Sequence, residues 1–426
     1  MKIEELYPIY LQYPSIQTDT RKLKKGDLFF ALKGPSFNGN SFAQQAIEAG
    51  AAYAVIDEAE YAIEGKTILT EDVLTTLQQL ALHHRQQFSI PFIAITGSNG
   101  KTTTKELIHA VLSSTFKTYT TEGNLNNHIG VPLTILKIRK DAQMAVIEMG
   151  ANHQKEIASY CTYALPTYGL ITNVGKAHLE GFGGEDGVRK GKGELFDHLR
   201  THNGTAFIFN DYDYLLEMSQ GIPHIFTYGT FNAQVSGTAT ATDPYLQVRF
   251  NAGLEGIIHT HLVGGYNLPN VLAAAAVGTF FKVPSEKIRQ ALENYQPTNS
   301  RSQMMEKGSN RIILDAYNAN PSSMKLAIEN FAKAHGNNKI LVLGGMAELG
   351  PGSVQEHQEI VNQISSYPWK EVLLVGGDFM KLDHPFKRFQ NAMEAGEWLK
   401  TQQAQNSYLL IKGSRSMQME KVLDYL

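Results

Sequence analysis

The residues best suited to phosphate chemistry are 97–104, with the sequence GSNGKTTT. They follow the apolar run Phe92–Ile95, which is typical of a buried parallel strand, and a helix is expected to begin at Lys101. Free N–H groups at a helix N-terminus attract anions, and glycines let the backbone approach them closely. Lys101 would then reach the terminal phosphates, and the Thr102 hydroxyl would hold Mg²⁺. Ile95 stands where the full Walker pattern has a glycine, so we interpret the stretch as a shortened P-loop rather than a tight turn with a surface lysine.

Three further polar residues follow apolar strands. Glu148 closes the run Met144–Ile147, and a carboxylate at the end of a strand beside the P-loop strand suits Mg²⁺ better than it suits helix capping. Asn173 and His178 follow the strand expected at 168–172. Asn173 could donate to a phosphate oxygen, whereas His178 could bind a second metal or be an ordinary hydrogen-bonded histidine. Lys192, in GVRKGKGELFDHL, looks on spacing alone like part of a solvated basic turn.

The last third of the chain has its own polar loops at strand ends. Asp315 ends an expected strand at 311–315 and could hold a ribose hydroxyl, although the Asn-rich stretch up to Pro321 could equally be helix capping. Loops at 344–350 and 412–415 occupy equivalent places. Ligands of open α/β sheets bind at such strand ends, and polar loops at strand ends in three domains suggest one cleft shared among them. Near the N-terminus, the clusters at 18–21 and 36–40 are interpreted as turns.

Composition sets limits on the class of protein. The chain has 426 residues, 42% of them hydrophobic and 19% charged, which describes an ordinary globular protein of two to four domains. Its net charge is −3, so the chain has no excess of positive charge that would indicate binding to nucleic acid or anionic membranes. The single cysteine, Cys161, fits a reducing, cytoplasmic environment. No signal peptide and no apolar run long enough for membrane insertion are recognised.

Alternating strand and helix patterns predict an α/β fold in three domains. Residues 1–88 are expected to form a small α/β domain, with strands at 27–32 and 51–57 flanking a helix at 41–49. Residues 89–297 are expected to form a P-loop ATPase-like, mostly parallel sheet with an antiparallel flank at 238–250 and 256–262. Residues 298–426 are expected to form a Rossmann-like domain with strands at 311–315, 339–344, 371–376 and 408–412.

Together these motifs resemble the Mur ligase family, in order and over essentially the whole chain. The segments that carry the resemblance are TGSNGKTTTKE, GNLNNHIGVPLTIL, EMGANHQKEI, LITNVGKAHLEGFG, KGKGELFDHL, GGYNLPNVLAAAAVG, DAYNANPSSM, MAELG and KGSRSMQME. The resemblance implies a cytoplasmic, monomeric, ADP-forming ligase. It would use ATP and Mg²⁺ ions to join D-alanyl-D-alanine to UDP-N-acetylmuramoyl-tripeptide. The first domain would bind the UDP end, the second ATP, and the third the amine.

The resemblance also assigns residues. The ATP contacts would be Gly97, Ser98, Asn99, Gly100, Lys101, Thr102, Thr103, Asn173, Asn267, Arg301 and Asp315. The metal ligands would be Thr102, Glu148, His178 and Lys192. Lys192 would be carbamylated, since a carbamate offers oxygen ligands where an ammonium would repel Mg²⁺, and with Lys101 and His178 it would serve catalysis. The substrate contacts would be Asp19, Arg21, Asn38, Asn40, Asn124, Asn126, Asn127, Tyr317, Asn318 and Asn320.

The chain departs from the family pattern in three places. Thr20 replaces the serine of a frequent Asp-Ser-Arg, Asn38-Gly39-Asn40 replaces Asp-Gly-His, and Gly345 stands where an aspartate is frequent. These positions concern contacts with uridine and the dipeptide. The alternatives are a sister ligase that adds another amino acid, and a P-loop regulatory module that hydrolyses nucleotide without either co-substrate. An inactive scaffold is disfavoured by the intact Gly100-Lys101-Thr102.

Overall fold

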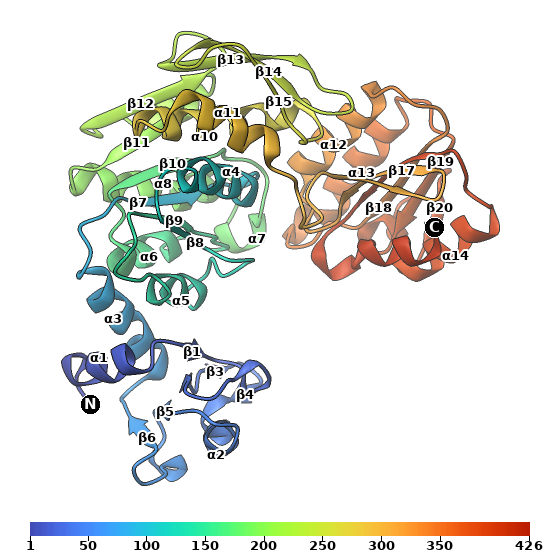
Figure 1. Ribbon diagram of the computed structural model, residues 1–426. Coiled ribbons are helices and arrows are strands. Elements are labelled where there is room, and N and C mark those ends of the chain that lie inside the picture. Colours follow the sequence, from blue (N-terminus) through green and yellow to red (C-terminus); the bar gives the residue numbers. More distant parts are fainter.

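The computed structural model describes residues 1–426 and consists of three α/β units that follow one another along the chain (Figure 1). The N-terminal unit lies below the central unit in this view, and the C-terminal unit lies to the side of the central one. The expected α/β fold in three domains is confirmed, while the exact boundaries at 88/89 and 297/298 stay predictions. None of the helices combines the length and the apolar character that a membrane crossing requires.

The N-terminal unit is built on a parallel sheet in the order β1-β2-β5-β6, with a separate β3-β4 hairpin. The expected strands and helix correspond to β2, β5 and α2. The helix α1, which contains Pro8, was not predicted. The elements are α1 Ile3–Gln12, β1 Ile16–Gln17, β2 Leu28–Phe30, β3 Lys33–Gly34, β4 Phe37–Asn38, α2 Ala43–Glu48, β5 Tyr53–Ile56, β6 Thr67–Leu69 and α3 Val73–Arg85.

The central unit is a nine-stranded sheet in the order β15-β14-β13-β12-β11-β10-β7-β9-β8. The strands from β13 to β8 pair in parallel, as expected for strands joined by helical crossovers. Its strands are β7 Phe92–Thr96, β8 Thr118–Thr120, β9 Met144–Glu148, β10 Tyr168–Ile171, β11 Thr205–Phe209, β12 His224–Gly229, β13 Val235–Ala241, β14 Gln247–Ala252 and β15 Ile257–His259. Its helices are α4 Lys101–Ser113, α5 Gly130–Leu136, α6 Glu156–Ala164, α7 Leu179–Phe182, α8 Glu185–Thr201, α9 Asp213–Met218, α10 Leu268–Phe280 and α11 Ser285–Asn294.

The antiparallel flank exists, but its strands differ from those expected. The segment 238–250 was predicted as one strand, and the structure divides it between β13 and β14, which pair antiparallel; β15 then pairs antiparallel with β14. The turn between them contains Asp243-Pro244. Proline has no N–H to donate to a ladder, so a strand does not continue through it.

The C-terminal unit is a six-stranded sheet in the order β16-β17-β21-β18-β19-β20. All pairs are parallel except β16–β17, so β16 is an antiparallel edge that the sequence pattern did not reveal. The elements are β16 Gln303–Lys307, β17 Asn310–Asp315, α12 Pro321–Lys333, β18 Lys339–Gly344, α13 Ser353–Ile364, β19 Glu371–Val375, β20 Lys387–Phe389, α14 Ala392–Thr401 and β21 Tyr408–Lys412.

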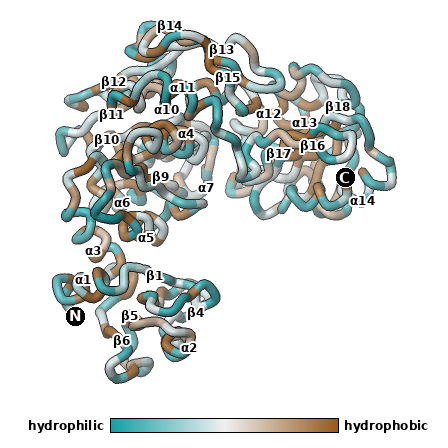
Figure 2. Tube along the Cα trace, in the orientation of Figure 1, coloured by the Kyte–Doolittle hydropathy of each residue, from teal (hydrophilic) through white to brown (hydrophobic).

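The apolar cores show how firmly the units are joined. One core runs from Leu6 and Tyr10 of α1 through the whole central sheet to Leu292, so the N-terminal unit is attached through apolar packing. The C-terminal sheet has its own cores, one on each face. Hydrophobic stretches follow the elements inside the units, while the outer loops are polar (Figure 2). The joint to the C-terminal unit is therefore mainly polar.

Candidate functional site

The P-loop has the local geometry that its residue types predict. Residues 97–100 connect β7 to α4, which begins at Lys101 as expected. Gly97 and Gly100 have φ angles of 140° and 78°, and a Cβ at Gly97 would lie 2.0 Å from Thr172 Oγ1. Neither position accepts a side chain without strain. The Lys101 ammonium donates to the carbonyl oxygens of Gly97 at 2.6 Å and Ser98 at 3.2 Å, and burial lowers its pKa to about 8.

Glu148 lies next to this loop with one carboxylate oxygen unused. It ends β9, which pairs with β7, and its side chain is buried. Its Oε1 accepts hydrogen bonds from Thr102 Oγ1 at 3.1 Å and Asn126 Nδ2 at 2.7 Å. Its Oε2 is buried and has no partner. A hydroxyl oxygen and a free carboxylate oxygen side by side fit Mg²⁺, which takes few protein ligands besides substrate phosphates.

Residues 173–178, which we call the bridging loop, are bound to the P-loop backbone. The Asn99 N–H donates to Asn173 Oδ1 at 2.9 Å, and Asn173 Nδ2 donates to the Asn99 carbonyl at 3.0 Å. Ser98 Oγ donates to the Gly175 carbonyl at 3.0 Å and also lies 3.0 Å from the Gly175 N–H. The position of this loop is therefore fixed relative to the P-loop.

A cleft of about 900 Å³ lies between the central and C-terminal units, at the strand ends that carry these loops. It is large enough for a ligand the size of a nucleotide. Most of the residues predicted from the sequence line it: Ser98, Asn99, Gly100, Lys101, Thr102, Thr103, Asn124, Asn126, Asn127, Glu148, Asn173, His178, Asn267, Arg301, Asp315, Tyr317, Asn318 and Asn320. The cleft was expected to be shared among all three domains, and in the structure the central and C-terminal units line it while the N-terminal unit contributes no lining residue.

On the C-terminal side, Arg301 and Asp315, two of the residues predicted to contact adenosine, lie among charged and aromatic side chains. Asp315 accepts a hydrogen bond from Lys412 Nζ at 2.6 Å and from the Ser302 N–H at 3.1 Å. The Arg301 guanidinium lies over the Tyr317 ring, 3.7 Å from its centroid. Lys412 is fully buried, and a buried ammonium needs a counter-ion, which Asp315 supplies. The ion pair in turn fixes the Asp315 carboxylate at the edge of the cleft.

His178 lines the cleft, whereas Lys192 is not among the lining residues. His178 Nδ1 contacts the carboxylate of Glu348, which belongs to the C-terminal unit. Lys192 is buried and donates at 3.0 Å to the carbonyl of Ala151, a residue that lines the cleft. Burial lowers its pKa well below the usual range, and the positive charge of Lys101 acts in the same direction. No group of three or more His, Cys, Asp or Glu side chains is placed to hold a metal ion.

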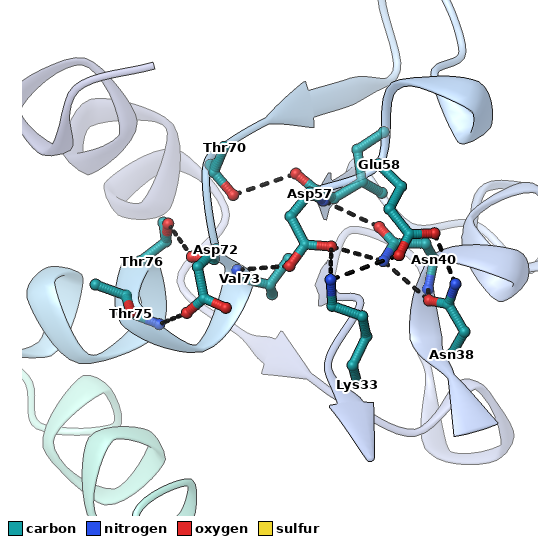
Figure 3. Close-up of polar contacts among 11 residues, drawn as sticks. Lys33, Asn38, Asn40, Asp57, Glu58, Thr70, Asp72, Val73, Thr75 and Thr76 are labelled. Atoms are coloured by element: carbon teal, nitrogen blue, oxygen red, sulfur yellow. Dashed lines mark hydrogen bonds and ion pairs between the residues drawn. The ribbon is translucent and has the colours of Figure 1, made fainter. Parts of the chain in front are cut away.

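The predicted residues of the N-terminal unit lie outside the cleft. Asp19 and Arg21 form an exposed ion pair at 2.8 Å, and hydrogen bonding by Arg21 lowers the pKa of Asp19 to about 2. Asn40 is fully buried and donates to Asp57 Oδ1 at 2.7 Å and Asn38 Oδ1 at 3.0 Å (Figure 3). Its amide holds two loops of this unit together, so it would position a ligand-binding surface rather than touch the ligand.

Several cleft residues were not predicted. Tyr212 and Tyr214 follow β11 and stack with ring centroids 5.3 Å apart, and Tyr214 OH accepts from the Val174 N–H at 3.2 Å. The sequence signal that could have indicated these two cleft residues was a pair of tyrosines shortly after an apolar strand. Glu348 and Lys412 belong to motifs that were recognised, MAELG and KGSRS, but nothing in the sequence shows which side chains they meet.

Three family models match the chain in succession. They are described as "Mur ligase family, catalytic domain" for residues 12–85, "Mur ligase middle domain" for 95–278 and "Mur ligase, glutamate ligase domain" for 300–415. The chain belongs to the Mur ligase family, whose members are ligases that form carbon–nitrogen bonds.

Among its relatives is the UDP-N-acetylmuramoyl-tripeptide–D-alanyl-D-alanine ligase of Bacillus subtilis (strain 168), with 34% identity over 96% of this chain and 92% of the relative. The crystal structure of MurF from Acinetobacter baumannii has a TM-score of 0.89 and 31% identity, covering 100% of this chain and 98% of that one. MurF ligase from Thermotoga maritima, solved in complex with ADP, has a TM-score of 0.86 and 26% identity, covering 97% of both chains. The full-length match supports the Mur ligase architecture for all three units.

Proposed function

We propose that this chain uses ATP to join D-alanyl-D-alanine to the free peptide carboxylate of UDP-N-acetylmuramoyl-tripeptide, completing the pentapeptide precursor of peptidoglycan. The observation that carries the proposal is one cleft that combines a P-loop, the unpartnered Glu148 oxygen and the polar loops of a third unit, in a chain that matches ligases of this name over nearly its full length. Because the reaction consumes ATP and a nucleotide-linked substrate, we place it in the cytoplasm.

The chemistry requires activation of the acceptor carboxylate, because oxide is too poor a leaving group for direct attack by an amine. The carboxylate attacks the γ-phosphate of ATP in line and forms an acyl phosphate and ADP, while Lys101 and the P-loop N–H groups stabilise the charge. The free amine of the dipeptide then attacks the acyl carbon. The tetrahedral intermediate loses phosphate and a proton and leaves the amide. Enclosure between the two units keeps water from hydrolysing the acyl phosphate.

Each predicted residue has a place in this scheme. Thr102 and Glu148 would hold one Mg²⁺, His178 would bind a second, and bound magnesium would neutralise phosphate charge. Burial keeps a larger share of Lys192 as the neutral amine, which is the form that takes up carbon dioxide to give a carbamate. Asn173 would contact phosphate. The adenosine would be contacted by Asn267, Arg301 and Asp315.

The substrate would approach from two sides of the cleft. Asn124, Asn126 and Asn127 would face the sugar and peptide. Asp19, Arg21 and Asn38 would lie near the uridine end of the substrate, on a surface that the buried Asn40 positions. Tyr317, Asn318 and Asn320 would serve the incoming dipeptide. One chain supplies every residue in this scheme, so a monomer suffices.

The test is phosphate release with the UDP-linked tripeptide and D-alanyl-D-alanine supplied singly and together. The proposal expects sustained release only when both are present, with one amide formed per phosphate. Faster turnover with another amino acid would indicate a sister ligase. Equal rates without either co-substrate would indicate a nucleotide-hydrolysing regulatory module and would overturn the proposal.

A further inference from the structure

The C-terminal unit meets the central unit through few apolar contacts, so polar contacts decide how it docks. Its larger core includes only Val263 from the central unit, with Tyr245 packed at its margin. Interfaces of this kind permit relative motion of the units unless specific contacts hold them. Three ion pairs cross the joint: His178–Glu348, His335–Asp243 and Lys176–Glu356. Only the last has a permanently charged lysine as its cation.

We propose that Lys176 is a positioning residue for the ligation step. Its ion pair with Glu356 docks the C-terminal unit on the bridging loop, and thereby sets the distance between the bound amine and the acyl phosphate. The inference rests on the proposed function for the identity of the amine. It assigns a role to a lysine that lies outside the P-loop and whose ammonium pairs with Glu356 and Glu185.

The geometry of the pair supports a docking role. Lys176 Nζ lies 2.6 Å from Glu356 Oε1, and the side chains are 32% and 10% exposed. The other oxygen, Glu356 Oε2, is buried without a hydrogen-bond partner. Glu185, on the side of the central unit, is farther from the ammonium, at 3.9 Å, and more exposed. Loss of the lysine would leave a nearly buried carboxylate without its counter-ion, so the docked arrangement depends on the pair.

The bridging loop connects this pair to the reacting phosphate. The Lys176 N–H donates to Ser322 Oγ at 3.2 Å, in the first turn of α12. A Cβ on Gly175 would lie 3.1 Å from the same Ser322 Oγ, so the loop and the helix are already in close contact. Asn320, which caps α12, donates to Asn99 Oδ1 of the P-loop at 2.7 Å. Because the bridging loop is hydrogen-bonded to the P-loop, a helix docked on it is positioned relative to the phosphates.

The same helix offers a matched control. Lys325 of α12 pairs with Glu359 of α13 at 2.5 Å, one turn from Glu356. These side chains are 40% and 36% exposed, and both belong to the C-terminal unit. Lys325→Met therefore removes a lysine–glutamate pair of similar length, 2.5 Å against 2.6 Å, that lies within the C-terminal unit and does not cross the joint.

The experiment compares steady-state ligation by the wild type with that of its variants. These are Lys176→Met, Glu356→Gln, the double mutant of the two, Lys176→Arg and Lys325→Met. We expect Lys176→Met to raise KM for D-alanyl-D-alanine about tenfold, as for loss of a charge-assisted hydrogen bond, and to lower the amide formed per ATP consumed. ATP affinity and melting temperature should be unchanged. Lys176→Arg should restore most of the loss, and the double mutant should be no worse than Lys176→Met.

A Lys176→Met enzyme that matches Lys325→Met in both KM and coupling would overturn the inference, as would additive losses in the double mutant. Small-angle scattering of each variant with a non-hydrolysable ATP analogue gives a second readout that does not depend on turnover. Lys176→Met should have the larger radius of gyration, and Lys325→Met should not. If wild type forms no amide while this difference in scattering persists, the proposed function fails and the docking role stands.

Discussion

Replacing Glu148 by glutamine tests whether this buried carboxylate exists for the reaction or for the fold. Its side chain is 1% exposed and one oxygen lacks any partner. Removing the charge relieves a desolvation cost of about 1–3 kcal/mol. The substitution also removes the attraction between Glu148 and Lys101 and weakens the hydrogen bonds from Thr102 and Asn126. These losses lower the stability of the fold by about 1–2 kcal/mol. The two effects nearly cancel, so the free energy of unfolding should stay within about 1 kcal/mol of wild type.

Ligation should respond very differently. A site that has lost its magnesium ligand should turn over about 100-fold more slowly or worse, and raising magnesium should recover part of the rate. The assays are amide formation at several magnesium concentrations and thermal melting in EDTA. Glu64→Gln, on an exposed glutamate of the N-terminal unit, is the control for the substitution itself. A variant destabilised by about 3 kcal/mol or more while keeping its activity would refute the reasoning, because that is the signature of a structural buried charge.

Three other predictions concern the P-loop and the C-terminal unit. Lys101→Ala should abolish ligation with an unchanged circular dichroism spectrum, since the ammonium bonds only to carbonyls of its own loop; retained ligation would contradict the phosphate assignment. Gly97→Ala should weaken ATP binding about tenfold or more, measured by calorimetry, because its Cβ would overlap Thr172, whereas Gly352→Ala, with open space around it, should be neutral. His357 accepts from the Met346 N–H at 3.0 Å and burial lowers its pKa, so the folded form resists protonation. Below about pH 6.5 the unfolded chain therefore binds more protons than the folded chain, and the melting temperature should fall as the pH is lowered from 7.5 to 5.5. In His357→Gln the melting temperature should fall less steeply with pH.

The sequence was most informative where the chemistry is local. Glycines before Lys101 and an apolar strand behind them predict a glycine turn between a buried strand and a helix within ten residues, and the structure has that turn between β7 and α4. The strand ends of Glu148 and Asp315 were predictable for the same reason, because a polar residue after an apolar run marks the end of a buried strand.

Contacts between distant segments could not be read in this way. His178 and Glu348 are 170 residues apart, and only the docking of two separate sheets brings them together. Asn40 illustrates the opposite difficulty. An Asn-Gly-Asn stretch suits both a turn and a ligand contact, and only burial shows that its amide is already used within the fold.

The acyl phosphate is the central claim, and oxygen-18 in the acceptor carboxylate tests it most directly. The labelled UDP-linked tripeptide is incubated with ATP, magnesium and D-alanyl-D-alanine, and the released phosphate is analysed by mass spectrometry. The account predicts that each phosphate carries one labelled oxygen from the carboxylate and that the other stays in the new amide. Unlabelled phosphate, released in step with amide, would show that the carboxylate never attacks the γ-phosphate and would contradict the account.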